Sequence, residues 1–319
     1  MTQRTTVVTL PLELRVIETD HTYPVKDDIW SNWYTFGLRA FERLRDELKQ
    51  EGRPITSFAT TGTSNGIDAI AASLVFENLQ EVALIDLDER VVPVAKQNYL
   101  RYFSGKNVSA FAGSLLEPLV EKGITADLIY ANLPILPNGG DLIQGYRRSS
   151  RYEKGLFAQA KTEDWIKNYL LEPYYALLLQ AKDVLTPRGS VICSIGGRIP
   201  YSVIEQVIEK AGFKTQKLLT GFKVQTEPWE VLPGCADAEK DGVTFDFYRY
   251  DEAVAALRNH RLSSGKILEE PFMDLNKEEL KKIIEPYKIT AKQAHEMYLK
   301  NNYAKIGHVV HIVRAMKKD

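Results

Sequence analysis

The stretch that decides the fold of this chain is residues 60–66, Thr60-Thr61-Gly62-Thr63-Ser64-Asn65-Gly66. It follows the apolar run at residues 57–59 and precedes residues 67–72, whose composition favours a helix. A glycine turn between a strand and a helix brings backbone close to a ligand and directs the free amides of the helix N-terminus at it. Such a loop is also compatible with an ordinary tight turn, so the elements around it must decide.

Short apolar runs alternate with helical stretches from residue 55 onward, which is the signature of strand–helix units in a parallel sheet. The expected strands are residues 56–59, 81–85, 109–112, 126–131 and 190–195, and the expected helices are 67–76, 90–101, 164–185 and 201–211. We expect Pro173 to kink the helix over 164–185. Residues 214–221, 243–250 and 307–315 are also β-like, and the pattern leaves open which of them completes the sheet.

A chain of 319 residues predicts one central domain with additions at both ends, because single cores stop growing at about 250–300 residues. Residues 1–54 are expected to be a helical lead-in, with a helix over about 28–51 whose apolar side chains recur at helical spacing. Residues 55–250 form the expected catalytic domain. Residues 251–319 form a helical extension that could return a last strand to the sheet.

Bulk composition excludes several classes of protein. The formal charge of −1 lacks the basic excess that binding to nucleic acid requires. The apolar runs are far shorter than the ~20 residues that cross a bilayer, and the polar N-terminus does not resemble a signal peptide, so we expect a cytoplasmic protein. The oligomeric state stays open.

Neither the cysteines nor the histidines indicate a metal site. Cys193 lies in a strand-like run and Cys235 in a loop-like stretch, and two cysteines do not make a disulfide framework or a thiolate zinc site. His308 and His311 are three apart in a β-like run, so they point to opposite faces, and we expect structural or surface roles for both.

The element after the glycine loop strengthens the prediction of a ligand site. The run Ala83-Leu84-Ile85-Asp86 is a strand that ends in a carboxylate twenty-four residues after Gly62. A carboxylate at this place can accept both hydrogen bonds from a ribose diol. The acidic residues that follow, Asp88 and Glu89, are explained as charges at the start of a helix. We therefore predict that Asp86 binds a ribose.

The order of motifs over residues 55–250 resembles the class I S-adenosylmethionine-dependent methyltransferases. The motifs are the glycine loop, the acidic strand end, Gly113-Ser114-Leu115-Leu116-Glu117-Pro118, and the strand over residues 127–131 that exits into Asn-x-Pro. The resemblance implies a Rossmann-like, seven-stranded, mostly parallel α/β sheet with helices on both faces. It also implies the cofactor S-adenosyl-L-methionine, with contacts at Thr61, Gly62, Gly66, Asp86, Leu87, Ser114, Leu115 and Asn132.

Two features qualify this resemblance. Ser114 stands where many relatives carry an acid that holds the adenine amino group, so adenine binding is expected to depend more on backbone. A nicotinamide enzyme is the competing interpretation of the opening elements, but the loop lacks the Gly-x-Gly-x-x-Gly spacing.

Residues 132–135, Asn132-Leu133-Pro134-Ile135, resemble the Asn-Pro-Pro-Tyr signature of glutamine and adenine amino methyltransferases. In those families the asparagine and a proline carbonyl hold a planar amino group while the aromatic residue stacks on it. Leu133 and Ile135 replace the first proline and the aromatic ring, so the stacking surface is lost. We predict Asn132 and Pro134 as catalytic residues, with a turn role as the alternative for Asn132.

The span from residue 127 to 250 resembles the catalytic domain of methionine S-methyltransferases. The matching segments are Leu-Pro-Ile-Leu-Pro-Asn at 133–138, Ile-Gly-Gly-Arg at 195–198, residues 203–213, and Phe-Asp-Phe-Tyr at 245–248. This resemblance implies free methionine as acceptor and S-methylmethionine as product. A thioether carries no proton, so in-line displacement needs positioning and no base, and no base is evident beside Asn132 in the sequence.

An amino-acid substrate needs a partner for its carboxylate, and a planar bidentate arginine suits it best. Arg198 follows the fifth strand and is the first candidate, with Arg147 in the loop after the fourth strand as another. Trp33, Tyr34 and Tyr146 are candidate aromatic contacts to a cationic sulfonium. The alternative for Trp33 is simple core packing on its helix.

Three other functions stay open. The first is N-methylation of another small amino acid or amine, which would require a carboxylate base near the acceptor. The second is N5-methylation of a protein glutamine, against which the lost aromatic residue weighs. The third is a cofactor-binding protein without catalysis, against which the retained Asn132 and Pro134 weigh.

Overall fold

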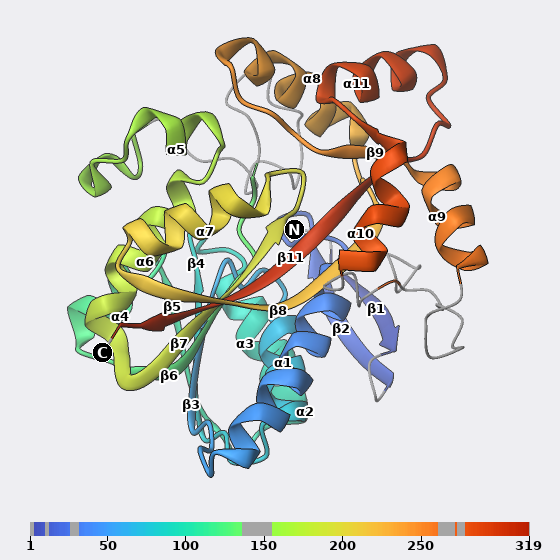
Figure 1. The fold of residues 1–319 in the computed structure, drawn as a ribbon. Coiled ribbons are helices and arrows are strands. Elements are labelled where there is room, and N and C mark those ends of the chain that lie inside the picture. The colour runs from blue at the N-terminus through green and yellow to red at the C-terminus, as the bar shows by residue number, and fades with distance from the viewer. Residues whose placement is uncertain are drawn as a thin grey trace.

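The computed structural model describes residues 3–9, 13–25, 32–135, 155–260, 272 and 278–318. These described residues form two sheets (Figure 1). The smaller is an N-terminal antiparallel hairpin of β1 (Gln3–Thr9) and β2 (Glu13–Thr19), which sequence analysis did not anticipate. The larger sheet carries the predicted strand–helix units.

The larger sheet is α/β and mostly parallel, as predicted. Five parallel strands lie in the order β5-β4-β3-β6-β7. Their bounds are β3 (Ser57–Thr61), β4 (Glu81–Asp86), β5 (Asn107–Ala112), β6 (Ala126–Ala131) and β7 (Leu185–Gly196). The chain runs outward from β3 to β5, then returns to the other side of β3 at β6. Ligands bind at such a reversal, beyond the carboxyl ends of the strands.

The strands that complete the sheet come from the C-terminal part of the chain. β11 (Ile306–Lys317) lies antiparallel between β7 and β8 (Phe213–Val224), which gives the expected Rossmann-like arrangement of seven strands. β9 (Phe247–Arg249) and β10 (Lys288–Ile289) add a short extension beside the start of β11. The question that the sequence pattern left open is thus answered by long-range pairing of β11.

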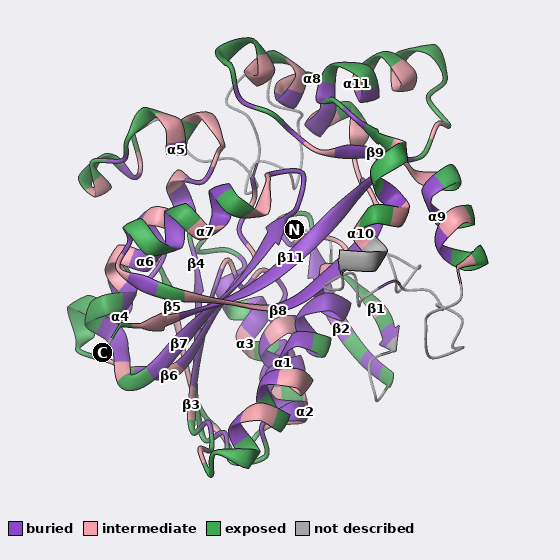
Figure 2. Ribbon diagram, viewed as in Figure 1, coloured by how far each residue is buried: buried purple, intermediate pink, exposed green. Residues whose placement is uncertain are grey.

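Helices cover both faces of the sheet, and the strands between them are buried (Figures 1 and 2). One core cluster joins the sheet to α1 (Trp33–Gln50), α2 (Ile67–Val75) and α3 (Val92–Tyr102). The other cluster includes residues of α4 (Glu117–Lys122), α5 (Asp164–Asn168), α6 (Glu172–Val184), α7 (Tyr201–Lys210), α8 (Pro228–Ala238) and α11 (Ala291–Lys300). The remaining helices are α9 (Tyr250–Asn259) and α10 (Glu278–Ile284), with short 3₁₀ turns at Ala158–Ala160, Glu239–Asp241 and Glu285–Tyr287.

Three local expectations were wrong. The helix expected over residues 164–185 is two helices, α5 and α6, separated where Leu170 adopts a positive φ of 64°. Pro173 lies in the first turn of α6, where its missing N–H leaves no hydrogen bond unmade, so it starts a helix and does not kink one. Cys235, expected in a loop, is buried within α8.

His308 and His311 on β11 are both buried. Within the described ranges, no group of three His, Cys, Asp or Glu side chains is arranged to hold a metal ion. The helices of that part of the chain include none that is long and apolar enough to span a membrane.

Candidate functional site

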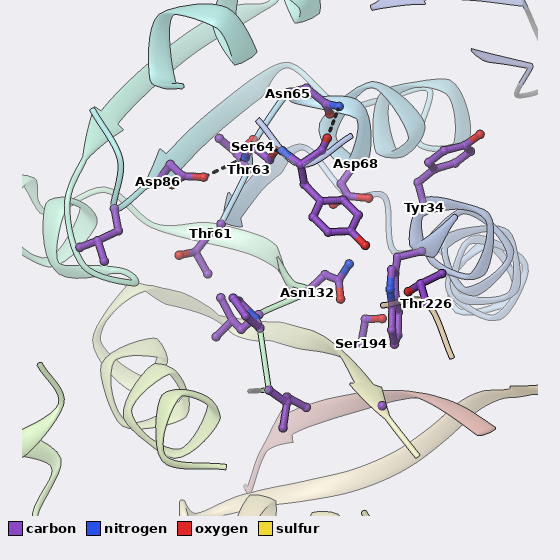
Figure 3. Close-up of a pocket in the computed structure, with 18 of the residues that line it drawn as sticks. Tyr34, Thr61, Thr63, Ser64, Asn65, Asp68, Asp86, Asn132, Ser194 and Thr226 are labelled. Carbon is purple, nitrogen blue, oxygen red and sulfur yellow. Dashed lines mark hydrogen bonds between the residues drawn. The ribbon is translucent and has the colours of Figure 1, made fainter. Parts of the chain in front are cut away.

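One pocket at the carboxyl ends of β3, β4, β6 and β7 collects most of the predicted residues (Figure 3). Its walls include Thr61, Gly62, Asp86, Leu87, Ser114, Leu115, Asn132, Pro134, Arg198, Trp33 and Tyr34. Gly66 does not line the pocket. Tyr146 and Arg147 lie outside the described residues.

The glycine loop combines two different uses of glycine. Gly62 has φ +68° and faces the pocket, where a Cβ would come within 3.4 Å of the Leu133 side chain. Gly66 has φ +82°, and a Cβ on it would lie 2.8 Å from the backbone oxygen of Ala95 on α3. Gly66 therefore permits close packing of α2 against α3, while Gly62 presents backbone to the pocket.

The carboxylate of Asp86 accepts backbone hydrogen bonds from the glycine loop and from the segment after β4. Oδ2 accepts a hydrogen bond from Ser64 N at 2.8 Å, and Oδ1 accepts one from Asp88 N at 3.0 Å. Burial raises the pKa of Asp86, and these backbone donors oppose that shift. The backbone of Leu87 also donates to this carboxylate, which has about four lone-pair sites, so an acceptor site is left for a ligand hydroxyl. A ribose diol can use that site.

Apolar side chains line the pocket beside Asp86. Leu87 is 45% exposed and Leu115 is 4% exposed, with a positive φ of 53° at Leu115. Ser114 also lines the pocket, and it is buried. This part of the pocket offers apolar contact area for a planar ring.

Residues 21–25 form a pocket wall that sequence analysis missed. Tyr23 N donates to Ser64 Oγ at 2.7 Å, and the Asn65 side chain donates to Tyr23 O at 3.4 Å. Asn98 on α3 is fully buried and joins β2, which precedes this segment, to the loop, because its amide bonds both backbone groups of Ile17 and also Asn65 O. No local sequence pattern signals these contacts between distant segments.

The exit of β6 is held in place from two sides. Tyr174 is buried on α6, where its hydroxyl accepts from Leu133 N at 2.9 Å and donates to Ser194 O at 2.5 Å. Arg198 Nη2 donates to Ile135 O at 2.5 Å. The side chain of Asn132 faces the pocket and bonds to none of the described residues. Its amide is thus presented to a ligand by a loop with fixed backbone.

Arg198 is a buried cation without a carboxylate partner in the described ranges. It is 5% exposed, Nη1 bonds Gln225 Oε1 at 3.4 Å, and Nε has no hydrogen-bond partner. Burial lowers the pKa of Arg198, although a guanidinium stays charged. A buried charge without a counter-ion is costly, so this end of the pocket favours an anionic group of a ligand.

Asp68 is a pocket residue that sequence analysis did not single out. It lies in the first turn of α2, is half-buried, and makes no hydrogen bond or ion pair with a described residue. Burial raises the pKa of Asp68 from 3.8 to about 7. An acid in the first turn of a helix is usually explained by the helix dipole, which is why its position in the sequence carried no signal.

The aromatic side chains predicted to contact a sulfonium, Trp33 and Tyr34, also contact other residues of the protein. The Trp33 ring lies 4.7 Å from Lys223 Nζ and 5.9 Å from the ring of His308. Tyr34 is 6% exposed and belongs to the core cluster of α1. Both residues line the pocket, so each combines core packing with access to a ligand.

A known protein that is similar to part of this chain in sequence is a methyltransferase. No protein-family model matches the chain. The release factor glutamine methyltransferase of Bacillus subtilis (strain 168) is 32% identical over 96 residues, which are 30% of this chain and 31% of that protein. The match thus spans about a third of the relative's length. It confirms a resemblance to methyltransferases over that stretch.

Solved structures with a similar arrangement are also methyltransferases by description. One is a SAM dependent methyltransferase from Agrobacterium tumefaciens, with TM-score 0.43, 12% identity, and coverage of 69% of this chain and 63% of that one. Another is a putative sarcosine dimethylglycine methyltransferase from Galdieria sulphuraria, with TM-score 0.42, 11% identity and 94% coverage of both chains. A third is a ribosomal protein L11 methylase from Lactobacillus delbrueckii subsp. bulgaricus, with TM-score 0.37, 19% identity, and coverage of 60% and 72%.

Proposed function

We propose that this chain is an S-adenosyl-L-methionine-dependent methyltransferase that acts on a free amino acid. The methyltransferase relative supports the reaction class, and the pocket fits the cofactor. Asp86 has an acceptor site for a ribose diol, Gly62 presents backbone, and Leu87 with Leu115 supplies apolar contact for adenine. S-adenosyl-L-methionine, when bound, supplies an electrophilic methyl group on a sulfonium.

The observation that carries the choice of acceptor is Arg198. Its buried guanidinium lines the same pocket as Asp86 and Asn132, and it has no carboxylate partner in the described part of the chain. The α-carboxylate of an amino acid supplies the missing anion and matches the planar donors of the guanidinium.

Free methionine is the proposed acceptor, on the strength of the motifs at residues 133–138, 195–198 and 245–248. The acceptor sulfur would gain the methyl group while the donor sulfonium loses it, and no proton is released. The residues of the chain then have to align the two sulfur atoms and exclude water. Leu133 and Ile135, which replace the first proline and the aromatic residue of the signature, are 6% and 4% exposed and carry no aromatic face for a planar amide.

A second candidate is N-methylation of an amino acid or amine. Asp68 favours it, because a nitrogen acceptor must lose a proton and a carboxylate with a pKa of about 7 can take it near neutral pH. The absence of an evident base, which favoured a thioether in the sequence, therefore no longer separates the two acceptors. The glutamine methyltransferase relative keeps a glutamine side chain among the acceptors to be tested.

A product screen tests the proposal. Purified protein is incubated with methyl-labelled cofactor and separate acceptors: methionine, the other free amino acids, simple amines, and a glutamine-containing peptide. Mass spectrometry and NMR then identify the methylated atom. We expect S-methylmethionine as the product, and Arg198→Lys should raise the KM for methionine strongly while leaving cofactor affinity nearly unchanged. Methylation of the peptide alone would reject a free amino acid, and transfer to none of the acceptors would reject the activity.

A further inference from the structure

The pocket wall of residues 21–25 belongs to the N-terminal hairpin, which lies outside the main sheet (Figure 1). The last residue of the wall is bonded to the hairpin itself, because Glu18 Oε1 accepts from Val25 N at 2.5 Å and Glu18 is buried. Leu14 and Val16 on β2 are also buried, and they belong to the core cluster that includes α1, α2 and α3. The wall is therefore attached to a docked element of the fold.

Two chains of polar contacts join this wall to Asp86, the residue proposed to bind the ribose. In the first, Asp86 Oδ2 accepts from Ser64 N at 2.8 Å (Figure 3), and Ser64 Oγ accepts from Tyr23 N at 2.7 Å. In the second, Asp86 Oδ1 accepts from Asp88 N at 3.0 Å, and Asp88 Oδ2 lies 3.7 Å from His21 Nδ1. A single residue thus separates each oxygen of Asp86 from the wall, which places the wall at the ribose end of the pocket.

The backbone of Ser64 indicates that its side chain has a specific use. Ser64 has a positive φ of 48°, a conformation that glycine adopts without strain and that other residues rarely adopt. Glycine at this position would keep the N–H that donates to Asp86, but it would lack the Oγ that accepts from Tyr23 N. The serine side chain therefore serves the contact with the wall and not the shape of the loop.

We propose that residues 21–25 bind the adenosyl part of S-adenosyl-L-methionine, and that Ser64 is the positioning residue that joins this wall to Asp86. The inference rests on the cofactor of the proposed function and does not depend on the methyl acceptor. The wall presents Tyr23 and Val25 to the pocket, so it covers the bound nucleoside with aromatic and apolar surface. Because hydrogen bonds to a carboxylate are stronger where water is excluded, the wall strengthens the contact between Asp86 and the ribose.

Binding measurements test the wall without requiring turnover. Calorimetry compares wild type and Ser64→Gly for two ligands: S-adenosylhomocysteine, and 5′-methylthioadenosine, which keeps the adenosyl group but lacks the amino-acid part. Hydrogen exchange, followed by mass spectrometry, compares the amides of residues 21–25 with those of α9, a helix that does not line the pocket. Lys161→Gly is the matched control, because Lys161 is exposed, lies outside the pocket and has a positive φ of 47°. Circular dichroism verifies that each variant is folded.

We expect both ligands to protect the wall in wild type. At about ten times the Kd of each ligand, exchange in residues 21–25 should slow by about tenfold, because the wall opens only after the ligand leaves. The amides of α9 should slow less. Ser64→Gly should bind both ligands about three- to tenfold more weakly, since Tyr23 N loses its acceptor, and it should show weaker protection of the wall. Lys161→Gly should behave as wild type.

The inference and the proposed function fail in different ways. If wild type binds S-adenosylhomocysteine but the wall slows no more than α9, residues 21–25 do not bind the cofactor. Protection by S-adenosylhomocysteine and not by bound 5′-methylthioadenosine would reject the adenosyl part as the contact. Wild-type affinity in Ser64→Gly, or an equal loss in Lys161→Gly, would reject Ser64 as the positioning residue. If wild type binds neither ligand, the proposed function itself fails.

Discussion

Replacing Asp86 with alanine tests the cofactor end of the pocket most directly. The carboxylate accepts hydrogen bonds from Ser64 N at 2.8 Å and from Asp88 N at 3.0 Å, and it faces the pocket with its remaining acceptor site. The change therefore removes the proposed contacts to the ribose and also the support of the glycine loop.

The expected magnitude follows from these contacts. A hydrogen bond to a charged group contributes about 1.5–3 kcal/mol, and 1.4 kcal/mol corresponds to about tenfold in Kd. We expect Asp86→Ala to weaken the binding of S-adenosylhomocysteine by at least about tenfold. The two amides that lose their acceptor should also lower the free energy of unfolding by about 1–3 kcal/mol.

A cofactor analogue separates the ribose contact from the loop. Calorimetry is performed on wild type and Asp86→Ala with S-adenosylhomocysteine and with its 2′-deoxy analogue, and Asp183→Ala serves as the surface control. Wild type should bind the deoxy analogue more weakly than the parent compound. Asp86→Ala should bind the two compounds alike, because the acceptor of the missing hydroxyl is already gone.

The refuting results are specific. Wild-type affinity in an Asp86→Ala protein that circular dichroism shows to be folded would remove Asp86 from the cofactor site. An undiminished preference of that variant for the ribose compound would assign the diol to another group.

Two further predictions concern stability. The pKa of Asp68 is raised from 3.8 to about 7, so its ionised form disfavours folding: the stability of wild type relative to Asp68→Asn should fall as the pH rises from about 4 to 7. Tyr130 on β6 is electrostatically coupled to Asp68, and burial raises the pKa of Tyr130 well above its usual value, so Tyr130 stays neutral over this range. Tyr34 on α1 lines the same pocket. If the melting temperatures of the two proteins change in parallel with pH, the prediction is contradicted. A residue other than glycine at a positive φ costs about 1–3 kcal/mol. Gly66→Ala should lower the free energy of unfolding by more than this, because a Cβ on Gly66 would also lie 2.8 Å from Ala95 O. Gly52→Ala has the positive φ without any neighbour within 4 Å, so it should lose only the backbone contribution. Denaturant titrations that give equal losses for the two variants would show that the approach to α3 costs nothing.

Local sequence patterns determined much of the fold. The glycine loop, the acidic strand end and the alternation of strands and helices are properties of short segments, and the structure confirms the parallel strands β3 to β7 at or near their expected positions. The same patterns indicated the residues that line the pocket from the strand ends, such as Asp86, Asn132 and Arg198. These residues follow strands whose carboxyl ends must meet at one edge of a parallel sheet, so local order was sufficient to bring them together.

Other features depended on contacts between distant parts of the chain. The place of β11 between β7 and β8 is decided by antiparallel pairing with strands that precede it by about a hundred residues, and no local pattern encodes that choice. Residues 21–25 follow β2 directly, and Asn98 on α3 links β2 to the glycine loop.

Asp68 shows why part of the pocket could be identified only in the tertiary structure. In the sequence it is an acid in the first turn of a helix, a common and solvated position. In the fold, Asp68 lines the pocket, where it makes no hydrogen bond or ion pair with a described residue, and burial raises its pKa to about 7. The sequence by itself determined which residues stand at the strand ends, whereas only the tertiary structure decided which charged side chains line the pocket without a partner in the described residues, because solvation and pairing are properties of three-dimensional surroundings.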